Sequence, residues 1–444
     1  MFFKIANRAV SVYKDTVSSI GFIPTLISVC CGLLAIGILA IDTNKATAYL
    51  LDHAPLVVIR DGDTARVILS TMVGGLVSLT VFSFTMVMAQ LNRAASNYSP
   101  RLLPGLISTR SHQVVLGIFL GAITFCLIVL ISVEPGDDSY QLPGLAILVA
   151  VIFGLGSLGL FVYFIHRISL AIQITNILER VSSETARRLT RLDEEKEERH
   201  VGQTSNSGFE SAKSIRAEFS GYYHGCNVEP LVTLAQGNDL VIEVLPVQGL
   251  FVLEGTTVVN VGSEIDEETA EKILACLRYS RNDLVEDNYV LGFKQICEIA
   301  VRAMSPGTND PGTAMNAIDH LTKLFGLRMR IDDEEEYSDE NGDVRLMLNV
   351  VDFSELLYLL CSSLRLYCKH DVVIVLKLLQ MFDYLLQIPA ELDSHHEAVA
   401  REFRNLINDA EVSIENKADL KAVRDFAGKV GESPHGEILS ESEG

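Results

Sequence analysis

Residues 67–104 read VILSTMVGGLVSLTVFSFTMVMAQLNRAASNYSPRLLP, and this stretch decides the fold class of the chain. Its first part is apolar and about 20 residues long, the length that an α-helix needs to cross a bilayer. Pro100 and Pro104 prevent a simple continuation of that helix. When each residue is turned by the helical angle, the small and polar residues gather in one sector. This sector contains Ser70, Thr71, Gly74, Ser78, Thr85 and Ala89 in the span, and Asn92 and Ser96 beyond it.

The small and polar sector has two interpretations. Ser70, Gly74 and Ser78 form a small-xxx-small ladder, which lets the backbone of a second helix approach closely. The span would then be a tightly packed member of a helix bundle. Alternatively, the same sector lines a polar path across the membrane. The sequence leaves both interpretations open.

Charge divides the chain into two halves. The 444 residues carry a formal net charge of -21, although 48% of them are hydrophobic. Residues 1–165 hold nine basic and eight acidic residues, whereas the rest of the chain holds 27 basic and 49 acidic residues. We therefore predict a nearly neutral membrane half followed by an acidic soluble half. An acidic surface repels phosphate backbones, so nucleic acid is not expected as a partner.

Four apolar segments predict a membrane domain over residues 20–165. No Asp, Glu, Lys or Arg lies inside them. This argues against a proton pump or a charge-coupled transporter, because both need ionisable groups within the membrane. The predicted spans are 20–41, 67–89, 114–133 and 145–165, each about as long as a bilayer-crossing helix must be.

Two further segments flank the predicted spans. Residues 1–19 place apolar side chains at helical spacing, which is typical of an amphipathic helix on the membrane surface. A plain polar lead-in to the first span fits the same residues. After the last span, residues 166–200 are predicted to form a connecting helix with heptad spacing from Ala171 to Leu192. That helix would either bundle with copies of itself or pack on its own chain.

The remaining soluble half is predicted to contain a small sheet module and a helical domain. Short β-branched and aromatic runs separated by glycines predict a β-rich module over residues 214–262. Helices dominate residues 263–430, with an acidic solvated loop at 332–343 and an extra strand at 344–351. The polar residues 431–444 are predicted to be a disordered tail. The expected fold is therefore an α+β membrane protein with four transmembrane helices, a cytosolic β-rich module and an α-helical domain.

A second unusual stretch, AVRAMSPGTNDPGTAMNAID, covers residues 300–319. A helix is expected to end near Met304, and Asp310 and Pro311 suit the N-cap and first position of the next helix. The result is a tight helix–loop–helix. This segment has two interpretations. It binds a ligand, an ion or another subunit, or it is a rigid structural corner. Its polar and turn residues are Ser305, Pro306, Asn309, Asp310, Pro311 and Thr313.

Both unusual stretches resemble those of a family of bacterial membrane proteins called domain of unknown function 2254. The resemblance rests on AQLNRAASNYSPRLLP, which contains Arg101, and on ICEIAVRAMSPGTNDPGTA. The GLFVLEG segment and the run Arg281–Asp287–Gly292 also fit the family, so the resemblance covers nearly the whole chain. It implies an integral inner-membrane protein and no activity, so no catalytic or binding residue is transferred. The family pattern has a hydrophobic residue where Thr308 stands, which is a small departure.

Motifs of known catalytic chemistry are absent from the sequence. It has no Gly-rich phosphate loop followed by Lys and Ser/Thr, no HExxH and no nucleophile elbow. The eight cysteines lack CxxC or His-paired metal spacing. We interpret the pair His395–His396 as a surface pair. The sequence therefore predicts a protein that is not an enzyme and has no cofactor and no metal.

Two functions fit these features. The first is an oligomeric channel or channel-like permeability protein, in which the polar sector lines the path and the acidic half forms a cytosolic vestibule. The alternative is a membrane-anchored ligand sensor or scaffold, with the corner at Ser305–Thr313 as the contact and the spans serving only as an anchor. The transported or bound species is an ion or small ligand that the sequence does not identify.

We predict that both termini face the cytoplasm. The loop with Arg93, Arg101 and Arg110 is basic, whereas the next loop, EPGDDSYQLP, has no basic residue, and basic loops stay on the cytoplasmic side. Cysteine labelling from outside intact cells should therefore modify Asp63→Cys and leave Ser108→Cys unmodified. The reverse pattern would overturn the topology, including the cytoplasmic position of the acidic half.

Overall fold

The computed structural model of the chain describes residues 21–41, 59, 61–97, 110–133, 142–171, 173–198, 212–280, 288–333, 335–339, 341–432 and 438. The predicted surface segment at 1–19, Arg101 and most of the tail at 431–444 lie outside these residues. The chain divides into two compact units, Met1–Gln173 and Ile174–Gly444.

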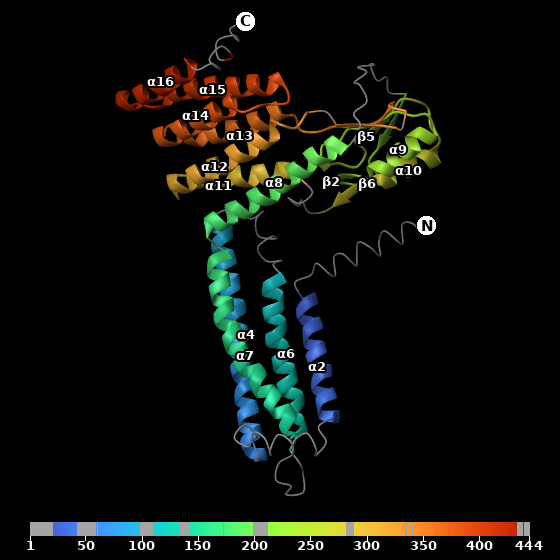
Figure 1. The fold of residues 1–444 in the computed structure, drawn as a ribbon, viewed down its shortest axis with the longest axis vertical. Coiled ribbons are helices and arrows are strands. Elements are labelled where there is room, and N and C mark those ends of the chain that lie inside the picture. Colours follow the sequence, from blue (N-terminus) through green and yellow to red (C-terminus); the bar gives the residue numbers. More distant parts are fainter. Residues whose placement is uncertain are drawn as a thin grey trace. The chain divides into compact units, whose positions relative to one another are not determined.

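The first unit contains four helices that are long and apolar enough to cross a membrane, as predicted (Figure 1). The second of them extends beyond the predicted span 67–89 at both ends. It starts early because Asp61 caps it: the Thr64 N–H donates to Asp61 Oδ2 at 2.8 Å. The four helices are α2 (Phe22–Ile41), α4 (Gly62–Asn97), α6 (Arg110–Ser132) and α7 (Gly144–Ala171).

Helices α2 and α6 approach each other closely. A Cβ atom added at Gly121 of α6 would lie 2.7 Å from Cys31 Sγ of α2. The hydroxyls of Ser28 and Thr124 hydrogen-bond across the same interface at 2.8 Å. Close packing and interhelical hydrogen bonds are the forces that hold helices together in lipid, where no hydrophobic drive between them remains.

Helices α4, α6 and α7 share a second interface that is apolar. Phe125 of α6 and Phe153 of α7 meet edge to face with ring centroids 5.0 Å apart. Leu69 and Leu76 of α4 are buried in the same cluster. One face of α4 is therefore used for packing within the chain, and the opposite face carries the small and polar sector.

The chain leaves the fourth span through two helices, α7 and α8 (Ile174–Glu198), where one helix was predicted over 166–200. Helix α8 packs on α11 (Tyr289–Ala303) and α12 (Pro311–Arg328) within the second unit. Its residues at heptad spacing include the buried Leu178, Ser182, Thr185 and Leu189. The structure thus uses this face for packing on the same chain.

The second unit contains two small sheets, which confirms the predicted β-rich module. The five-stranded sheet has the order β1-β5-β3-β8-β7, and the three-stranded sheet has the order β4-β2-β6. Helix α9 (Val228–Gly237) follows β2, and helix α10 (Glu267–Cys276) precedes β6. The strands are β1 (Lys213–Arg216), β2 (Gly221–Cys226), β3 (Ile242–Val244), β4 (Phe251–Val252), β5 (Thr257–Val261), β6 (Leu277–Ser280), β7 (Glu335–Ser338) and β8 (Val344–Leu348).

The segments around residues 332–351 complete the larger sheet. Strand β8 pairs in parallel with β3, as expected for an extra strand at this position. The prediction of a solvated loop over 332–343 was wrong for its centre, because β7 pairs with β8 and buries Tyr337. Acidic side chains are tolerated here because β7 lies at the edge of the sheet, where one side of the strand stays open to solvent.

The helical domain is also confirmed. Figure 1 shows α11 to α16 stacked next to one another at one side of the strands. Aspartate and asparagine side chains cap five of the six helices that begin after residue 288. The side chains that accept hydrogen bonds from backbone N–H groups are those of Asn288, Asp310, Asp352, Asp371 and Asn416. Besides α11 and α12, this domain contains α13 (Phe353–Cys368), α14 (Val372–Gln387), α15 (Asp393–Ser413) and α16 (Lys417–Gly431).

The close contact of α8 with α11 yields a stability prediction. A Cβ atom at Gly292 of α11 would lie 1.8 Å from Thr185 Oγ1 of α8. Gly292→Ala should therefore destabilise the second unit by about 1–3 kcal/mol through overpacking. Thermal unfolding of the full chain in detergent measures this loss, and adding Thr185→Ala should recover most of it.

Gly428→Ala on α16 is the matched control for this prediction. A Cβ atom at Gly428 would meet nothing within 4 Å among the described residues. This variant should be neutral or slightly stabilising, because alanine favours a helix more than glycine does. Equal unfolding temperatures for the two variants would show that α8 and α11 are not held at this distance.

Candidate functional site

The small and polar sector of α4 lies on the surface of the first unit. Its hydroxyls hydrogen-bond to carbonyls of their own helix, with Ser70 Oγ 3.0 Å from Val67 O and Ser78 Oγ 2.9 Å from Gly74 O. Thr85 Oγ1 does the same, 2.8 Å from Val81 O. These hydroxyls therefore bond within α4 and not to another described helix of the first unit.

Gly74, in the centre of the ladder, has no close neighbour. A Cβ atom at this position would meet nothing within 4 Å among the described residues. Thr71 and Asn92 are exposed on α4 as well, and Ser96 belongs to the helix by its backbone. The described part of the chain thus supplies no helix that packs on the ladder. The surface is open to lipid, to solvent or to another molecule.

The polar side chains at the corner between α11 and α12 form hydrogen bonds with one another and with the nearby backbone. Asp310 accepts a hydrogen bond from the Thr313 N–H at 3.1 Å and one from the Thr313 hydroxyl at 2.6 Å. These bonds, led by the hydroxyl, lower the pKa of Asp310. Ser305 Oγ donates to Arg302 O at 2.7 Å, and Asn309 adopts a left-handed φ of 44°. Pro306 lies in this turn and Pro311 starts α12, so the arrangement favours a rigid corner over a ligand site.

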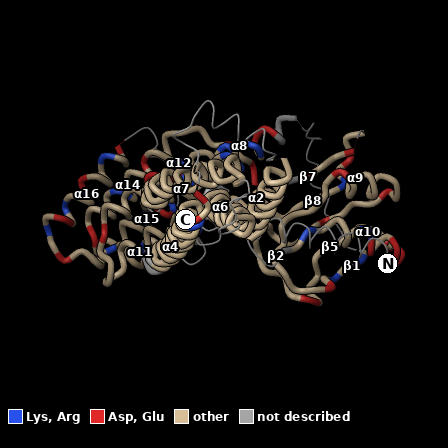
Figure 2. The backbone as a smooth tube through the Cα atoms, turned by 90° about the horizontal axis from the view of Figure 1, so that it is seen from below, with Lys and Arg blue, Asp and Glu red and all other residues tan. Residues whose placement is uncertain are grey.

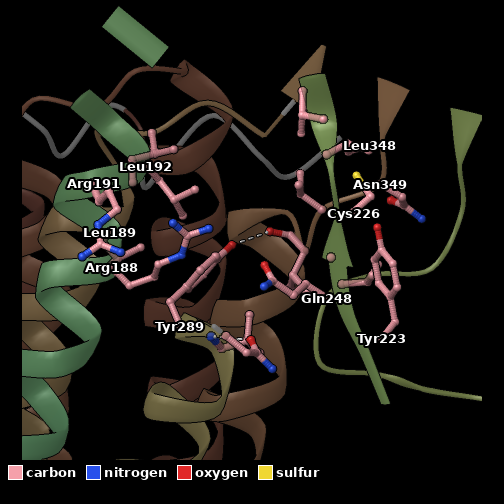
Figure 3. A pocket seen from close by; sticks show the side chains of 18 of the residues that line it. Arg188, Leu189, Arg191, Leu192, Tyr223, Cys226, Gln248, Tyr289, Leu348 and Asn349 are labelled. Atoms are coloured by element: carbon pink, nitrogen blue, oxygen red, sulfur yellow. Dashed lines mark hydrogen bonds between the residues drawn. The ribbon is translucent and has the colours of Figure 1, made fainter. Parts of the chain in front are cut away.

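A cavity of about 320 Å³ lies in the second unit, in a place that the sequence did not single out (Figure 3). Helix α8 forms one wall, and strands β2, β6, β7 and β8 with the loop after β3 contribute others. The start of α11 and the end of α12 complete it. Its polar and charged lining residues are Arg188, Arg191, Tyr223, Gln248, Arg278, Asn288, Tyr289, Arg328, Asp332, Tyr337 and Asn349.

Four of these lining residues are arginines, and they come from three different elements. Arg188 and Arg191 lie three residues apart on α8, so they share one face of the helix. Arg278 belongs to β6, and Arg328 is the last residue of α12. Asp332 is the acidic residue of the lining. Positive charge therefore converges on this cavity within a strongly acidic half of the chain, and Figure 2 shows basic positions along α8.

Arg328 is fixed in the wall of the cavity. It is 1% exposed, and its guanidinium donates to Ile331 O at 2.7 Å and to Val351 O at 3.0 Å. It also forms a salt bridge with Asp333. Its Nε atom is buried and has no hydrogen-bond partner among the described residues. The wall thus contains a permanent positive charge with one donor still unused.

Asp333 links Arg328 to the helical core. Its second carboxylate oxygen lies 3.1 Å from His395 Nε2, and its first accepts the Phe353 N–H at 2.9 Å. Burial would raise the pKa of Asp333. The His395 hydrogen bond and the Arg328 charge outweigh burial and hold that pKa below its ordinary value.

His395 is buried, so its interpretation as a surface residue was wrong. It is 1% exposed, and its Nδ1 atom lies 3.1 Å from Met329 O. Both ring nitrogens therefore face oxygen acceptors, Met329 O and Asp333 Oδ2. The chain of Arg328, Asp333 and His395 ties the cavity wall to α15.

Uncharged hydrogen-bonding groups line the side of the cavity that faces α8. Figure 3 shows Arg188 and Arg191 on α8 at one side and Tyr223 and Asn349 at the strand side. The Asn349 amide donates to Leu245 O at 3.0 Å, which fixes its orientation. The Tyr289 hydroxyl is 3.5 Å from Val351 O. Arg278 of β6 lies at the strand side as well, near Gln248, so neutral polar groups and a guanidinium line that side together.

Comparison with known proteins identifies the chain. Residues 17–384 match the family described as predicted membrane protein (DUF2254). The chain belongs to this family. The uncharacterized proteins Mb1321c of Mycobacterium bovis and Rv1290c of Mycobacterium tuberculosis are each 25% identical to it over 369 residues, which is 79% of this chain and 69% of theirs. No solved structure matches the chain.

The family match covers the membrane helices and the cavity alike. Residues 17–384 include all four candidate spans and the four arginines of the lining. The comparison therefore supports a membrane protein of this family, and it brings no activity with it.

Proposed function

We propose that this membrane protein is an anchored receptor for a small anionic ligand, which binds in the cavity of the second unit. The observation that carries the proposal is the convergence of Arg188, Arg191, Arg278 and Arg328 on that cavity. This is the sensor function considered from the sequence, with the site moved from the corner at Ser305–Thr313 to the cavity.

Charge and geometry both favour an anion. Guanidinium groups bind carboxylates and phosphates with paired hydrogen bonds, and they remain protonated at every physiological pH. The second half of the chain has 49 acidic and 27 basic residues, so its net charge disfavours anions, and an anion gains only where the arginines are close. A cavity of about 320 Å³ is at the lower end of the range for small-molecule sites.

The connection between α7 and α8 supports a role in signalling to the membrane. Helix α7 ends at Ala171 and α8 begins at Ile174, so a very short link joins the fourth span to the helix that carries Arg188 and Arg191. A ligand that shifts α8 would pull directly on that span. We propose binding without catalysis, in the inner membrane of a bacterium, with the receptor unit and both termini in the cytoplasm.

Arginine replacement tests the proposed function. Pyrophosphate is the probe, and titration calorimetry on the full chain in lipid nanodiscs is the measurement. Arg191→Ala and Arg278→Ala should each weaken pyrophosphate binding by about 1.5–3 kcal/mol, since each removes a charge-assisted hydrogen bond. Both residues are exposed, so the fold should persist.

Arg424→Ala is the matched control for these variants. Arg424 is an exposed arginine of α16 whose Nε lies 2.9 Å from Glu411. Its loss removes the same formal charge from the same unit, so it should leave pyrophosphate binding unchanged. Wild-type protein that binds no pyrophosphate, or equal weakening by Arg424→Ala and Arg191→Ala, would refute the receptor.

An oligomeric, channel-like protein is the second candidate function. The observation that favours it is the ladder Ser70–Gly74–Ser78, which lies on α4 and is covered by no described part of the chain. Another subunit could cover this surface, because small residues let helix backbones approach closely. A ring of such helices would place the hydroxyls of Ser78 and Thr85 along a polar path.

Gly74→Leu distinguishes the uses of this surface. If α4 packs on another subunit, the variant should dissociate in mild detergent, because a bulky side chain separates the helices. If the surface lines a path, ion or solute flux should fall while the assembly persists. Native mass spectrometry and flux on the same sample separate these results.

Gly121→Leu is the control for the membrane unit. Its side chain would collide with Cys31 of α2, so thermal stability should fall while the subunit number stays the same. A Gly74→Leu variant that equals the wild type in mass, stability and flux would mean that the ladder faces lipid.

A further inference from the structure

The geometry points to a nucleoside monophosphate as the ligand of the arginine-lined cavity. This inference rests on the proposed anion receptor and adds the class of molecule that it binds. A simple anion would need only the arginines. The cavity offers more, because amide and phenol side chains line it together with the arginines, and a simple anion would leave them unused.

The arginine side fits a phosphate group. Arg188 and Arg191 project from neighbouring turns of α8, and the buried Arg328 retains an unused donor at Nε. The two guanidinium groups of α8 can thus approach one tetrahedral anion, Arg328 adds positive charge from within the wall, and bidentate bonding to its oxygens favours phosphate. The lining contains a single acidic residue, Asp332, so the balance of charge in the cavity stays positive.

The amides of the lining fit a planar, hydrogen-bonding group such as a nucleobase. Asn349 is held by its bond to Leu245 O at 3.0 Å, and Gln248 is held by its bond to His224 O at 2.9 Å. Both amides donate to backbone carbonyls, which fixes their orientation in the lining. Fixed amides read the donor and acceptor edge of a base, and an aromatic ring such as that of Tyr289 offers a surface on which a base stacks.

The acidic surroundings agree with a free nucleotide and not with a nucleic acid. A polynucleotide would bring a row of phosphates against a half of the chain with 49 acidic and 27 basic residues. A mononucleotide places one phosphate beside the arginines and buries the rest. Apolar lining residues such as Leu189, Leu192 and Leu348 would contact its sugar and the faces of its base.

Titration calorimetry on the full chain in nanodiscs tests this inference. AMP, GMP, CMP and UMP are compared with ribose 5-phosphate, which has the same charged group and lacks the base. At least one nucleotide should bind at least about tenfold more tightly than ribose 5-phosphate, because stacking and base hydrogen bonds are added.

Three variants locate the two halves of the ligand. Asn349→Leu should remove the advantage of the nucleotide and leave ribose 5-phosphate within about twofold, because it removes an amide and no charge. Arg191→Ala should weaken both compounds at least about tenfold. Gln248→Leu repeats the test with the second amide proposed to contact the base. The unfolding temperature of each variant confirms that it folds.

The outcomes separate this inference from the proposed function. Equal affinity for ribose 5-phosphate and all four nucleotides would overturn the nucleotide and retain the anion receptor. Failure of pyrophosphate, ribose 5-phosphate and every nucleotide to bind would overturn both. A nucleotide preference that persists in both Asn349→Leu and Gln248→Leu would also overturn the assignment of the base to these amides.

Discussion

The second unit depends on one buried charge, the guanidinium of Arg328. A charge with 1% exposure is costly unless it is paired and hydrogen-bonded, and this one is held by two backbone carbonyls and by Asp333. His395 in turn holds Asp333, so the end of α12, the segment before α13 and the start of α15 are locked together. Breaking such a pair typically costs about 3–5 kcal/mol. The network places a permanent positive charge in the cavity wall at a position that the helical core fixes.

That fixed charge makes the cavity wall locally positive, although the second half of the chain is acidic. An acidic surface with arginines collected in one cavity discriminates by position, because anions are repelled everywhere except where the guanidinium groups are close. Arg188 and Arg191 extend the positive region onto α8, the helix that follows the fourth span almost without interruption. The cavity and the fourth span are therefore neighbours in the sequence, and for the proposed receptor this is the simplest physical route from binding to a change in the membrane.

The first unit follows a different constraint, because lipid provides no hydrophobic drive between helices. Close approach is concentrated between α2 and α6, where Gly121 leaves room for Cys31 and where Ser28 and Thr124 share a hydrogen bond. The ladder at Ser70, Gly74 and Ser78 was the more visible signal in the sequence, yet it is not used within the described part of the chain. Small residues at helical spacing permit close packing but do not specify which helix packs there. The ladder alone therefore did not reveal what lies against it.

The sequence by itself determined the four spans, the presence of a β-rich module and a helical domain, and the tight corner at Asp310. These features depend on local patterns: apolar length, β-branched runs between glycines, and a cap followed by proline. Only the tertiary structure decided the acidic edge strand β7, the burial of His395 and the cavity itself. The pairing of β7 with β8 joins near neighbours, but the edge of a sheet that accepts it is built from β3 and β5, far away in the chain. The arginines come from positions 188, 191, 278 and 328, and only the first two are close enough in sequence to suggest a common face. The other two join them because α12 and β6 end beside α8 in the folded unit, and no local pattern encodes that meeting.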